Sequence, residues 1–310
     1  MIKILTQREN HISRCPYREE FYRDYTRILH SRAFRRLRHK TQVFIAPQSD
    51  HICTRMEHSL IVASLARTVC RALNKKAHVR ISEDLAVAIA LGHDIGHAPF
   101  GHWGEDVLDE CLGEDGVFKH EIQSIRVVDL LESPYDEYGG LNLTLAVRDG
   151  IALHCGEQFD RSLKPKVWQD PESWRNFLRT LRSSDNSAAE TWKRAVPGTL
   201  EGCIVRFVDK IAYIGRDLED AIEHTYPPLI STEEALAETH GPWWQNGRFR
   251  NRAFIDACMR DLIESSTCEE IRFSENMYQL VKNVYETPEK VPCIRAVDGF
   301  LANITAKGLI

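Results

Sequence analysis

The sequence has 310 residues, with 43% hydrophobic and 27% charged side chains and a formal net charge of −5 at pH 7. These values are ordinary for a globular protein and exclude an overall positive field that would attract nucleic acid. No apolar run approaches the roughly 20 residues that a membrane-spanning helix needs, so no membrane partner is expected. Nine cysteines without a Cys-x-x-Cys pair predict reduced thiols in a cytoplasmic protein and argue against a cysteine-based zinc site.

Apolar residues at helical spacing predict an all-α fold, because no alternating pattern lasts long enough for a persistent strand. An irregular arm over residues 1–16 comes first, and Thr54 and Ser82 are predicted to cap the helices that follow them. The polar segment 156–186 has the weakest signs of core burial and is interpreted as a flap or insertion. Helices are expected at residues 17–39, 54–74, 84–91, 103–112, 120–132, 141–154, 199–225, 254–263 and 271–285.

The first predicted helix ends in a run of basic residues. A charge run of this kind is usually a solvated face of a helix. It can equally form a wall that binds phosphate groups, and the sequence alone leaves both interpretations open. The run consists of Arg32, Arg35, Arg36, Arg38 and Lys40.

The segment 91–102, Leu-Gly-His-Asp-Ile-Gly-His-Ala-Pro-Phe-Gly-His, has the strongest chemical pattern. It follows an apolar helix that is expected to be buried, and its glycines and proline end that helix in a sharp turn. His93 and Asp94 offer a nitrogen and an oxygen ligand from one short segment. The favourable placement of a histidine at a helix C-terminus would explain one histidine, but not this whole group. We therefore interpret the segment as a functional site.

Two distant residues become candidate partners for His93 and Asp94. His58 alone would more often be a structural histidine, and Asp209, beside the buried stripe of the 199–225 helix, could simply pair with a lysine or arginine. Together the four residues would supply two nitrogen and two oxygen ligands from three helices. That mixture suits a divalent transition ion such as Mn²⁺ or Co²⁺, or Mg²⁺ less well, with positions left for water and substrate.

Three further histidines suit a layer of groups around such an ion. His97, His102 and His120 could contact phosphates and transfer protons near neutral pH, and Glu105 could orient His102 from one turn away. A divalent ion with several histidines and arginines indicates hydrolysis of a phosphoester or phosphoanhydride.

The pattern of His58, His93-Asp94 and Asp209 resembles the HD-domain metal-dependent phosphohydrolases. Five motifs in register, the last made of two nearby segments, narrow the resemblance to the deoxyguanosine triphosphate triphosphohydrolase-like family, from about residue 14 to residue 225. The family implies cleavage of a dNTP, with dGTP among the expected substrates, by attack of water at the α-phosphorus to give deoxynucleoside and inorganic triphosphate. The segments are 34–44, 54–60, 92–102, 118–121, 201–205 and 209–213.

The resemblance also implies roles, residue by residue. His58, His93, Asp94 and Asp209 would be the metal ligands. The catalytic group would be His102, His120 and Glu105, supported by His97. The substrate would be bound by Gln42, Arg55, Lys210, Tyr213 and Asp217. A homo-oligomer and a nucleotide effector at a second site are also expected, and residues 118–121 depart from the family by reading Phe-Lys-His-Glu where many bacterial members have Phe-Glu-His-Asn.

The same resemblance predicts an HD-domain helical core with an additional C-terminal helical lobe. We expect an N-terminal arm and basic helix packed on the core over residues 1–53, the HD core over 54–226 and a C-terminal helical region over 227–310. Two alternatives stay open. One is a different HD phosphohydrolase, either a 5′-nucleotidase or a cyclic-nucleotide phosphodiesterase. The other is a regulator that binds nucleotide or nucleic acid without hydrolysis, which the acidic net charge disfavours.

Overall fold

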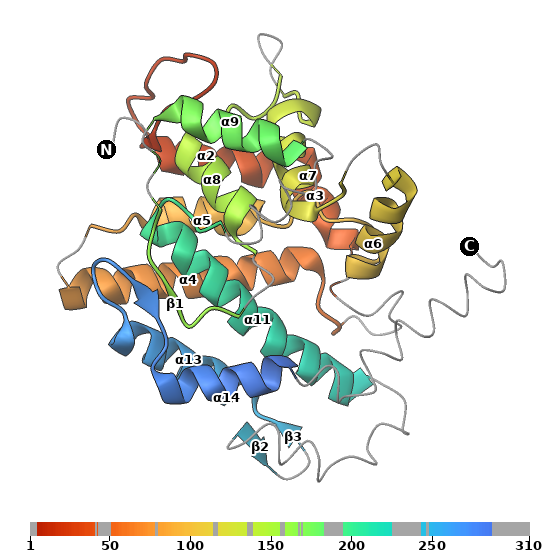
Figure 1. Cartoon of the computed structure of the whole chain (residues 1–310), viewed down its shortest axis with the longest axis vertical. Helices are drawn as coiled ribbons and strands as arrows, with labels where there is room; N and C mark the ends of the chain where they lie inside the picture. Colours follow the sequence, from red (N-terminus) through yellow and green to blue (C-terminus); the bar gives the residue numbers. More distant parts are fainter. Residues whose placement is uncertain are drawn as a thin grey trace, which may run out of the picture.

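The computed structural model is mainly helical in the part of the chain that it describes (Figure 1). This confirms the predicted all-α fold. In the described part, strands are limited to two short antiparallel pairs, of β1 (Ser162–Leu163) with β4 (Ile271–Arg272) and of β2 (Trp244–Gln245) with β3 (Arg248–Phe249). None of the described helices combines the length and apolar character needed to span a membrane. The described residues are 5–40, 42, 51–77, 80–113, 117–134, 139–155, 159–166, 168, 170–182, 195–224, 243–245 and 248–286.

The helices follow the predicted order along the chain, except that one additional helix, Pro171–Arg182, lies in the segment 156–186, for which a flap or insertion was expected. They are α2 (Glu20–His30), α3 (Arg32–Arg36), the short 3₁₀ helix η1 (Leu37–His39), α4 (Arg55–Ala77), α5 (Glu83–Gly92), α6 (Gly101–Leu112), α7 (His120–Arg126), the π-helical η3 (Val127–Leu131), α8 (Leu145–Leu153), α9 (Pro171–Arg182), α11 (Leu200–His224), α13 (Asn251–Ser265) and α14 (Glu275–Glu286).

Helix α5 lies at the centre of the core and is buried from Leu85 to Gly92. It packs against α2, α4, α8 and α11. Helix α13, from the C-terminal part of the chain, packs against α4 and α11 (Figure 1). The approach of α8 is close, since a Cβ at Gly150 would lie 2.3 Å from Cδ1 of Ile89. Because α5 is apolar throughout, its end delivers the following residues, His93 and Asp94, into the interior of the molecule.

The predicted caps agree with the structure. The Oγ1 of Thr54 accepts from the backbone N–H of Glu57 at 3.3 Å, and the Oγ of Ser82 accepts from that of Leu85 at 3.2 Å. A third cap breaks the predicted 17–39 helix, because Ser31 adopts an extended conformation and its hydroxyl accepts from the N–H of Phe34. The basic run therefore begins a new helix and does not end a long one.

Two other predicted helices have different bounds. The predicted 141–154 helix starts only at Leu145, because Asn142 has a left-handed backbone conformation and Thr144 is extended. Near the C-terminus, Ile271 pairs with β1, and the helix expected from that residue begins at Glu275. The predicted end of the 199–225 helix at Pro227-Pro228 lies outside the described residues.

The interpretation of residues 156–186 as a segment with little core burial is wrong for its described residues. Trp174 on α9 is fully buried and Leu163 on β1 is nearly so. The guanidinium of Arg148 lies 4.5 Å from the centroid of the Trp174 ring, so this region is anchored to α8. The surrounding polar residues concealed these apolar anchors in the sequence pattern.

Candidate functional site

Three helices bring the four predicted metal ligands together. His58 lies in the first turn of α4, His93 and Asp94 directly follow α5, and Asp209 lies on α11. The Nε2–H of His58 donates to Oδ1 of Asp209 at 2.8 Å. The Nε2 of His93 lies 3.5 Å from Oδ2 of Asp94 and 3.5 Å from Oδ1 of Asp209. All four side chains are buried, and we call them the ligand set.

The orientation of His93 suits a metal ligand. Its Nδ1–H donates to the carbonyl of Ala90 at 2.6 Å, which turns Nε2 toward the two carboxylates. Burial acts to lower the pKa of His93, but Asp94 and Asp209 outweigh it and raise that pKa to about 8, so a bound ion would replace a proton on Nε2. That buried nitrogen has no hydrogen-bond partner among the described residues. Metal-bound histidines typically donate their other ring N–H to a carbonyl or carboxylate in this way. The donor atoms of His58, His93 and Asp94 lie within 4.8 Å of one another, as do those of His93, His154 and Asp209, and both groups suit a divalent ion by their chemistry.

Both carboxylates of the ligand set are held in the ionised form. Burial acts to raise the pKa of Asp94, but the positive charge of Arg55 and the neighbouring histidines together outweigh it and hold that pKa well below its usual value. The Nη1–H of Arg55 donates to Oδ2 of Asp94 at 2.7 Å. Burial likewise acts to raise the pKa of Asp209, but the hydrogen bond from His58 and the nearby His93 together outweigh it and hold that pKa well below its usual value. The neighbours of Asp209 at this site are thus histidines, whereas the alternative from the sequence was a lysine or arginine partner.

A second group of side chains lies beside the ligand set and consists of His97, His102, Glu105 and His120, here called the histidine cluster. Donor atoms of all four lie within 4.8 Å of one another. Oε2 of Glu105 accepts from the Nδ1–H of His120 at 2.8 Å and lies 3.8 Å from Nδ1 of His102. The side chain of His102 is 74% exposed, whereas those of Glu105 and His120 are 6% exposed. His102 is therefore the member that a ligand from solvent can reach.

The turn before α6 places His102 next to the other members of the histidine cluster. Phe100 and Gly101 are both left-handed, each with a φ of 67°. Gly101 adopts this conformation readily, but Phe100 is strained there, and such strain is typical of functional sites. The strained turn reverses the chain between His97 and His102, so that their ring centroids lie 5.2 Å apart.

The members of the histidine cluster differ in charge. Burial and the nearby Arg55 charge lower the pKa of His97 well below its usual value, so this ring is neutral. Burial acts to lower the pKa of His120, but the Glu121 carboxylate and other partners outweigh it and raise that pKa well above its usual value. The stacked rings of these two histidines, 4.6 Å apart, thus combine one neutral and one protonated imidazole.

The predicted substrate-binding residues divide into two groups. Arg55 and Gln42 lie beside the ligand set, since Nη2 of Arg55 donates to the Gln42 carbonyl at 3.2 Å. Lys210 lies next to Asp209 in sequence, but its Nζ is 5.7 Å from the centroid of the Phe159 ring. Tyr213 and Asp217, both half-buried, follow Asp209 by one and two turns of α11 and extend its face of the helix.

The sequence analysis did not single out His154, which lies between the two groups. Its ring centroid is 4.9 Å from that of His93 and 5.3 Å from that of His120. Its Nδ1–H donates to the carbonyl of Ile151 at 2.7 Å, the same arrangement that orients His93. The sequence contains a usable signal, because both histidines directly follow the last turn of an apolar helix.

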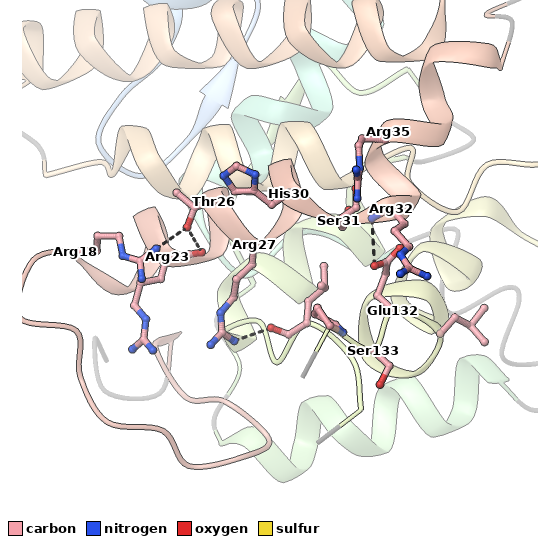
Figure 2. A pocket seen from close by; sticks show the side chains of 13 residues that line it. Arg18, Arg23, Thr26, Arg27, His30, Ser31, Arg32, Arg35, Glu132 and Ser133 are labelled. Carbon is pink, nitrogen blue, oxygen red and sulfur yellow. Dashed lines mark hydrogen bonds between the residues drawn. The ribbon is translucent and has the colours of Figure 1, made fainter. Parts of the chain in front are cut away.

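An arginine-rich pocket of about 800 Å³ lies along α2 (Figure 2). The carboxylate of Glu132, which also lines it, accepts from the backbone N–H groups of Arg32 and Ala33 at 3.2 and 2.6 Å. The predicted basic run is divided, because Lys40 does not line this pocket and donates through Nζ to the carbonyl of His97 at 2.5 Å. The basic residues of the pocket are Arg18, Arg23, Arg27, His30, Arg32 and Arg35.

Known proteins of one family are similar to this chain. The family model described as HD domain matches residues 55–214. A protein from Desulfatibacillum aliphaticivorans is 40% identical over 286 residues, covering 88% of this chain and 69% of the relative. A protein from Caldanaerobacter subterraneus subsp. tengcongensis is 40% identical over 271 residues, with coverages of 86% and 62%. Both are named deoxyguanosinetriphosphate triphosphohydrolase-like protein, and the chain spans only about two thirds of their lengths.

Proposed function

Because the chain belongs to the deoxyguanosinetriphosphate triphosphohydrolase-like group of HD-domain phosphohydrolases, we propose that it hydrolyses dNTPs, including dGTP. The products are the deoxynucleoside and inorganic triphosphate. One observation carries the proposal: a buried ligand set, with Nε2 of His93 facing two carboxylates, directly adjoins a histidine cluster that opens to solvent at His102. This arrangement supports attack of water at the α-phosphorus.

In this proposal His58, His93, Asp94 and Asp209 bind a divalent ion such as Mn²⁺, Mg²⁺ or Co²⁺. When bound, the ion supplies a Lewis acid that neutralises phosphate oxygens and activates water. Arg55 keeps Asp94 ionised and oriented through its 2.7 Å bond. The carbonyl of Ala90 fixes the ring of His93 and the nitrogen that it presents.

The histidine cluster carries out the proton transfer and binds the α-phosphate. His102, exposed on the first turn of α6, donates a proton to the departing 5′ oxygen, and Glu105 orients its ring. Behind it lies the positive charge of His120, which attracts the phosphate oxygens, and neutral His97 supports that ring by stacking on it at 4.6 Å. General acid catalysis of this kind contributes about 10²–10⁴-fold to a rate.

The deoxynucleoside lies along the face of α11 that continues beyond Asp209. Tyr213 packs against C2′ and excludes a ribose hydroxyl, and Asp217 lies one turn further. Gln42 binds the sugar 3′-hydroxyl or the base, with its buried Oε1 as a site for a donor. Arg55 and Lys210 contribute positive charge to the binding of the triphosphate.

Product analysis tests the proposal against a 5′-nucleotidase or cyclic-nucleotide phosphodiesterase. The purified protein is incubated with each dNTP and with Mn²⁺, Mg²⁺ or Co²⁺, and the products are separated by chromatography. Deoxynucleoside and intact triphosphate support the proposal. Hydrolysis confined to a nucleoside monophosphate or a cyclic nucleotide would overturn it. Salt-dependent binding of DNA without any turnover would instead indicate a regulator.

We expect the nucleotide effector to bind in the arginine-rich pocket and to act on a homo-oligomer of the chain. Its five arginines offer a nucleotide polyphosphate bidentate hydrogen bonds. We expect the double variant Arg32→Glu/Arg35→Glu to abolish any stimulation of hydrolysis by a second nucleotide while the unstimulated rate persists. Arg252→Glu, an exposed position on α13, is the matched control. Unchanged stimulation in the double variant would remove the pocket from this role, and light scattering reports the oligomer.

A further inference from the structure

A second group of metal-type donors lies next to the ligand set. It consists of His120 and Glu121 at the start of α7 with His154 and Cys155 directly after α8, and these two helices pack against each other (Figure 1). One donor atom from each of the four side chains lies within 4.8 Å of all the others. The three residues other than Cys155 are buried, and Cys155 is half-buried. The four residues form what we call the second donor group.

Both histidines of this group are oriented as metal ligands usually are. His120 donates through Nδ1–H to the Glu105 carboxylate at 2.8 Å, and its Nε2 lies 3.5 Å from Oε1 of Glu121. His154 donates through Nδ1–H to the Ile151 carbonyl at 2.7 Å, which leaves its lone pair on Nε2. A carboxylate or carbonyl behind the ring fixes the tautomer and raises the basicity of the ligand nitrogen.

Glu121 supplies an independent indication of a ligand. Its side chain is buried, with the residue 1% exposed, and its Oε2 has no hydrogen-bond partner in the described part of the chain. A buried oxygen without a partner is costly, at about 1–3 kcal/mol or more for a charged group. Protonated His120 can neutralise the carboxylate, but its Nε2 lies 3.5 Å from Oε1, and Oε2 stays without a hydrogen-bond partner among the described residues.

We propose that His120, Glu121, His154 and Cys155 bind a second transition-metal ion of the zinc type. Two imidazoles, one carboxylate and one thiolate match the ligands that Zn²⁺ takes in four-coordinate sites, whereas Mg²⁺ and Ca²⁺ prefer oxygen ligands alone. Cys155 and protonated His120 each lose a proton to solvent as the ion binds, so formation of the site releases both protons. The spacing of the cysteines in the sequence does not indicate this site, because Cys155 lies close to Glu121 and His120, which are 34 and 35 positions earlier in the chain.

The second donor group is also linked to the histidine cluster. Glu105 accepts from His120 and lies beside His102, so an ion on the far nitrogen of His120 fixes the carboxylate that orients His102. His154, a member of the second donor group, also adjoins the ligand set, with its ring 4.9 Å from that of His93. The proposal concerns metal binding only and does not depend on which phosphate compound the protein hydrolyses.

Cobalt titration of metal-free protein tests the proposal, with circular dichroism as a check on folding. We expect two equivalents of Co²⁺ to bind, and a near-ultraviolet absorption band from thiolate-to-cobalt charge transfer to accompany one of them. Glu121→Gln/Cys155→Ser should bind one equivalent and lose that band. Cys111→Ser, which alters an exposed cysteine on α6, should behave as the parent protein.

A second variant separates this proposal from the proposed function. Asp209→Ala should lose the equivalent bound by the ligand set and keep the thiolate band, because Asp209 is not in the second donor group. One equivalent without a thiolate band in the parent protein would overturn the proposal. So would a band that persists in folded Glu121→Gln/Cys155→Ser. In either of these cases, loss of hydrolysis in Asp209→Ala would still support the proposed function.

Discussion

Two buried polar regions of this molecule satisfy their hydrogen bonds to different degrees. Asp24 on α2 is fully buried, and its carboxylate accepts from Nη1 of Arg8 at 2.5 Å and from both the N–H and the hydroxyl of Thr144 at 2.9 and 2.6 Å. In and around the candidate site, by contrast, several buried atoms have no hydrogen-bond partner among the described residues. These atoms are His93 Nε2, His97 Nε2, Glu121 Oε2 and Gln42 Oε1.

The difference separates polar residues that hold the fold from those that await a ligand. A fully bonded buried carboxylate such as Asp24 fixes α2 against the segment before α8, so its removal should lower stability. Unsatisfied atoms that face one another lower stability in the free protein and gain partners when a ligand binds. The buried Nε atoms of Arg148 and Arg206 also have no hydrogen-bond partner among the described residues. They differ from the atoms of the candidate site, because other nitrogens of each guanidinium form ion pairs. Variants of the two regions should therefore fail in different ways.

The largest effect should come from Asp209→Ala. Asp209 meets both histidines of the ligand set, so its loss removes a ligand and the charge that attracts a cation. We expect bound metal and dNTP hydrolysis to fall below detection while circular dichroism retains the helical signal. Metal analysis, activity and dichroism on one preparation check this prediction. A variant that hydrolyses dNTPs at the parent rate would show that the ligand set is wrongly assigned.

A smaller loss is expected at His102, which we place in catalysis but not in metal binding. His102→Ala should keep the metal and dNTP affinity and lose at least about two orders of magnitude in single-turnover rate. Glu105→Gln should show a smaller loss of the same kind, because it only weakens the orientation of the ring. If His102→Ala fails solely because the metal has gone, His102 belongs to the coordination shell.

Asp24→Asn probes the satisfied region and should affect stability. Both carboxylate oxygens face donors, so whichever way the amide is turned its NH₂ group meets another donor. We expect a loss of about 3 kcal/mol in the free energy of unfolding, with the same hydrolysis rate per folded molecule. Urea unfolding measures it, and Asp256→Asn in an exposed ion pair on α13 should cause no measurable change. Equal stability of Asp24→Asn and Asp256→Asn would contradict the stabilising role given to the buried Asp24 carboxylate.

The smallest effect is expected at Tyr213, where only discrimination between sugars should change. The parent protein should hydrolyse dGTP much faster than GTP, and Tyr213→Ala should narrow that ratio by about tenfold, the range that one steric contact provides. The two kcat/KM values, measured on both proteins, give the ratio. Equal rates on the two nucleotides in the parent protein would remove Tyr213 from this role.

Local patterns made much of the fold predictable. Apolar periodicity and caps at Thr54 and Ser82 located α4 and α5, because both signals depend on neighbouring residues alone. The all-α class followed from the same periodicity. His58 and Asp209 are 151 positions apart, so periodicity could not pair them. They were paired by the number of ligands that an ion requires and by the family resemblance.

The features that the sequence analysis missed depend on contacts between distant segments. The start of α8 is delayed by the conformation of Asn142 and by the bond between Thr144 and Asp24 on α2. Trp174 is buried under Arg148, although polar residues surround it in sequence. His154 resembled an ordinary helix end, because only the packing of α8 on α5 and α7 places it between the two groups of histidines.

Hydrolysis of dGTP in water enriched in ¹⁸O tests the central claim, attack of water at the α-phosphorus, most directly. Mass spectrometry of the products locates the new oxygen. We predict one ¹⁸O in the inorganic triphosphate, at the phosphate that was α in dGTP, and none in deoxyguanosine. Label in deoxyguanosine, or release of labelled orthophosphate or pyrophosphate in place of triphosphate, would contradict the proposed reaction.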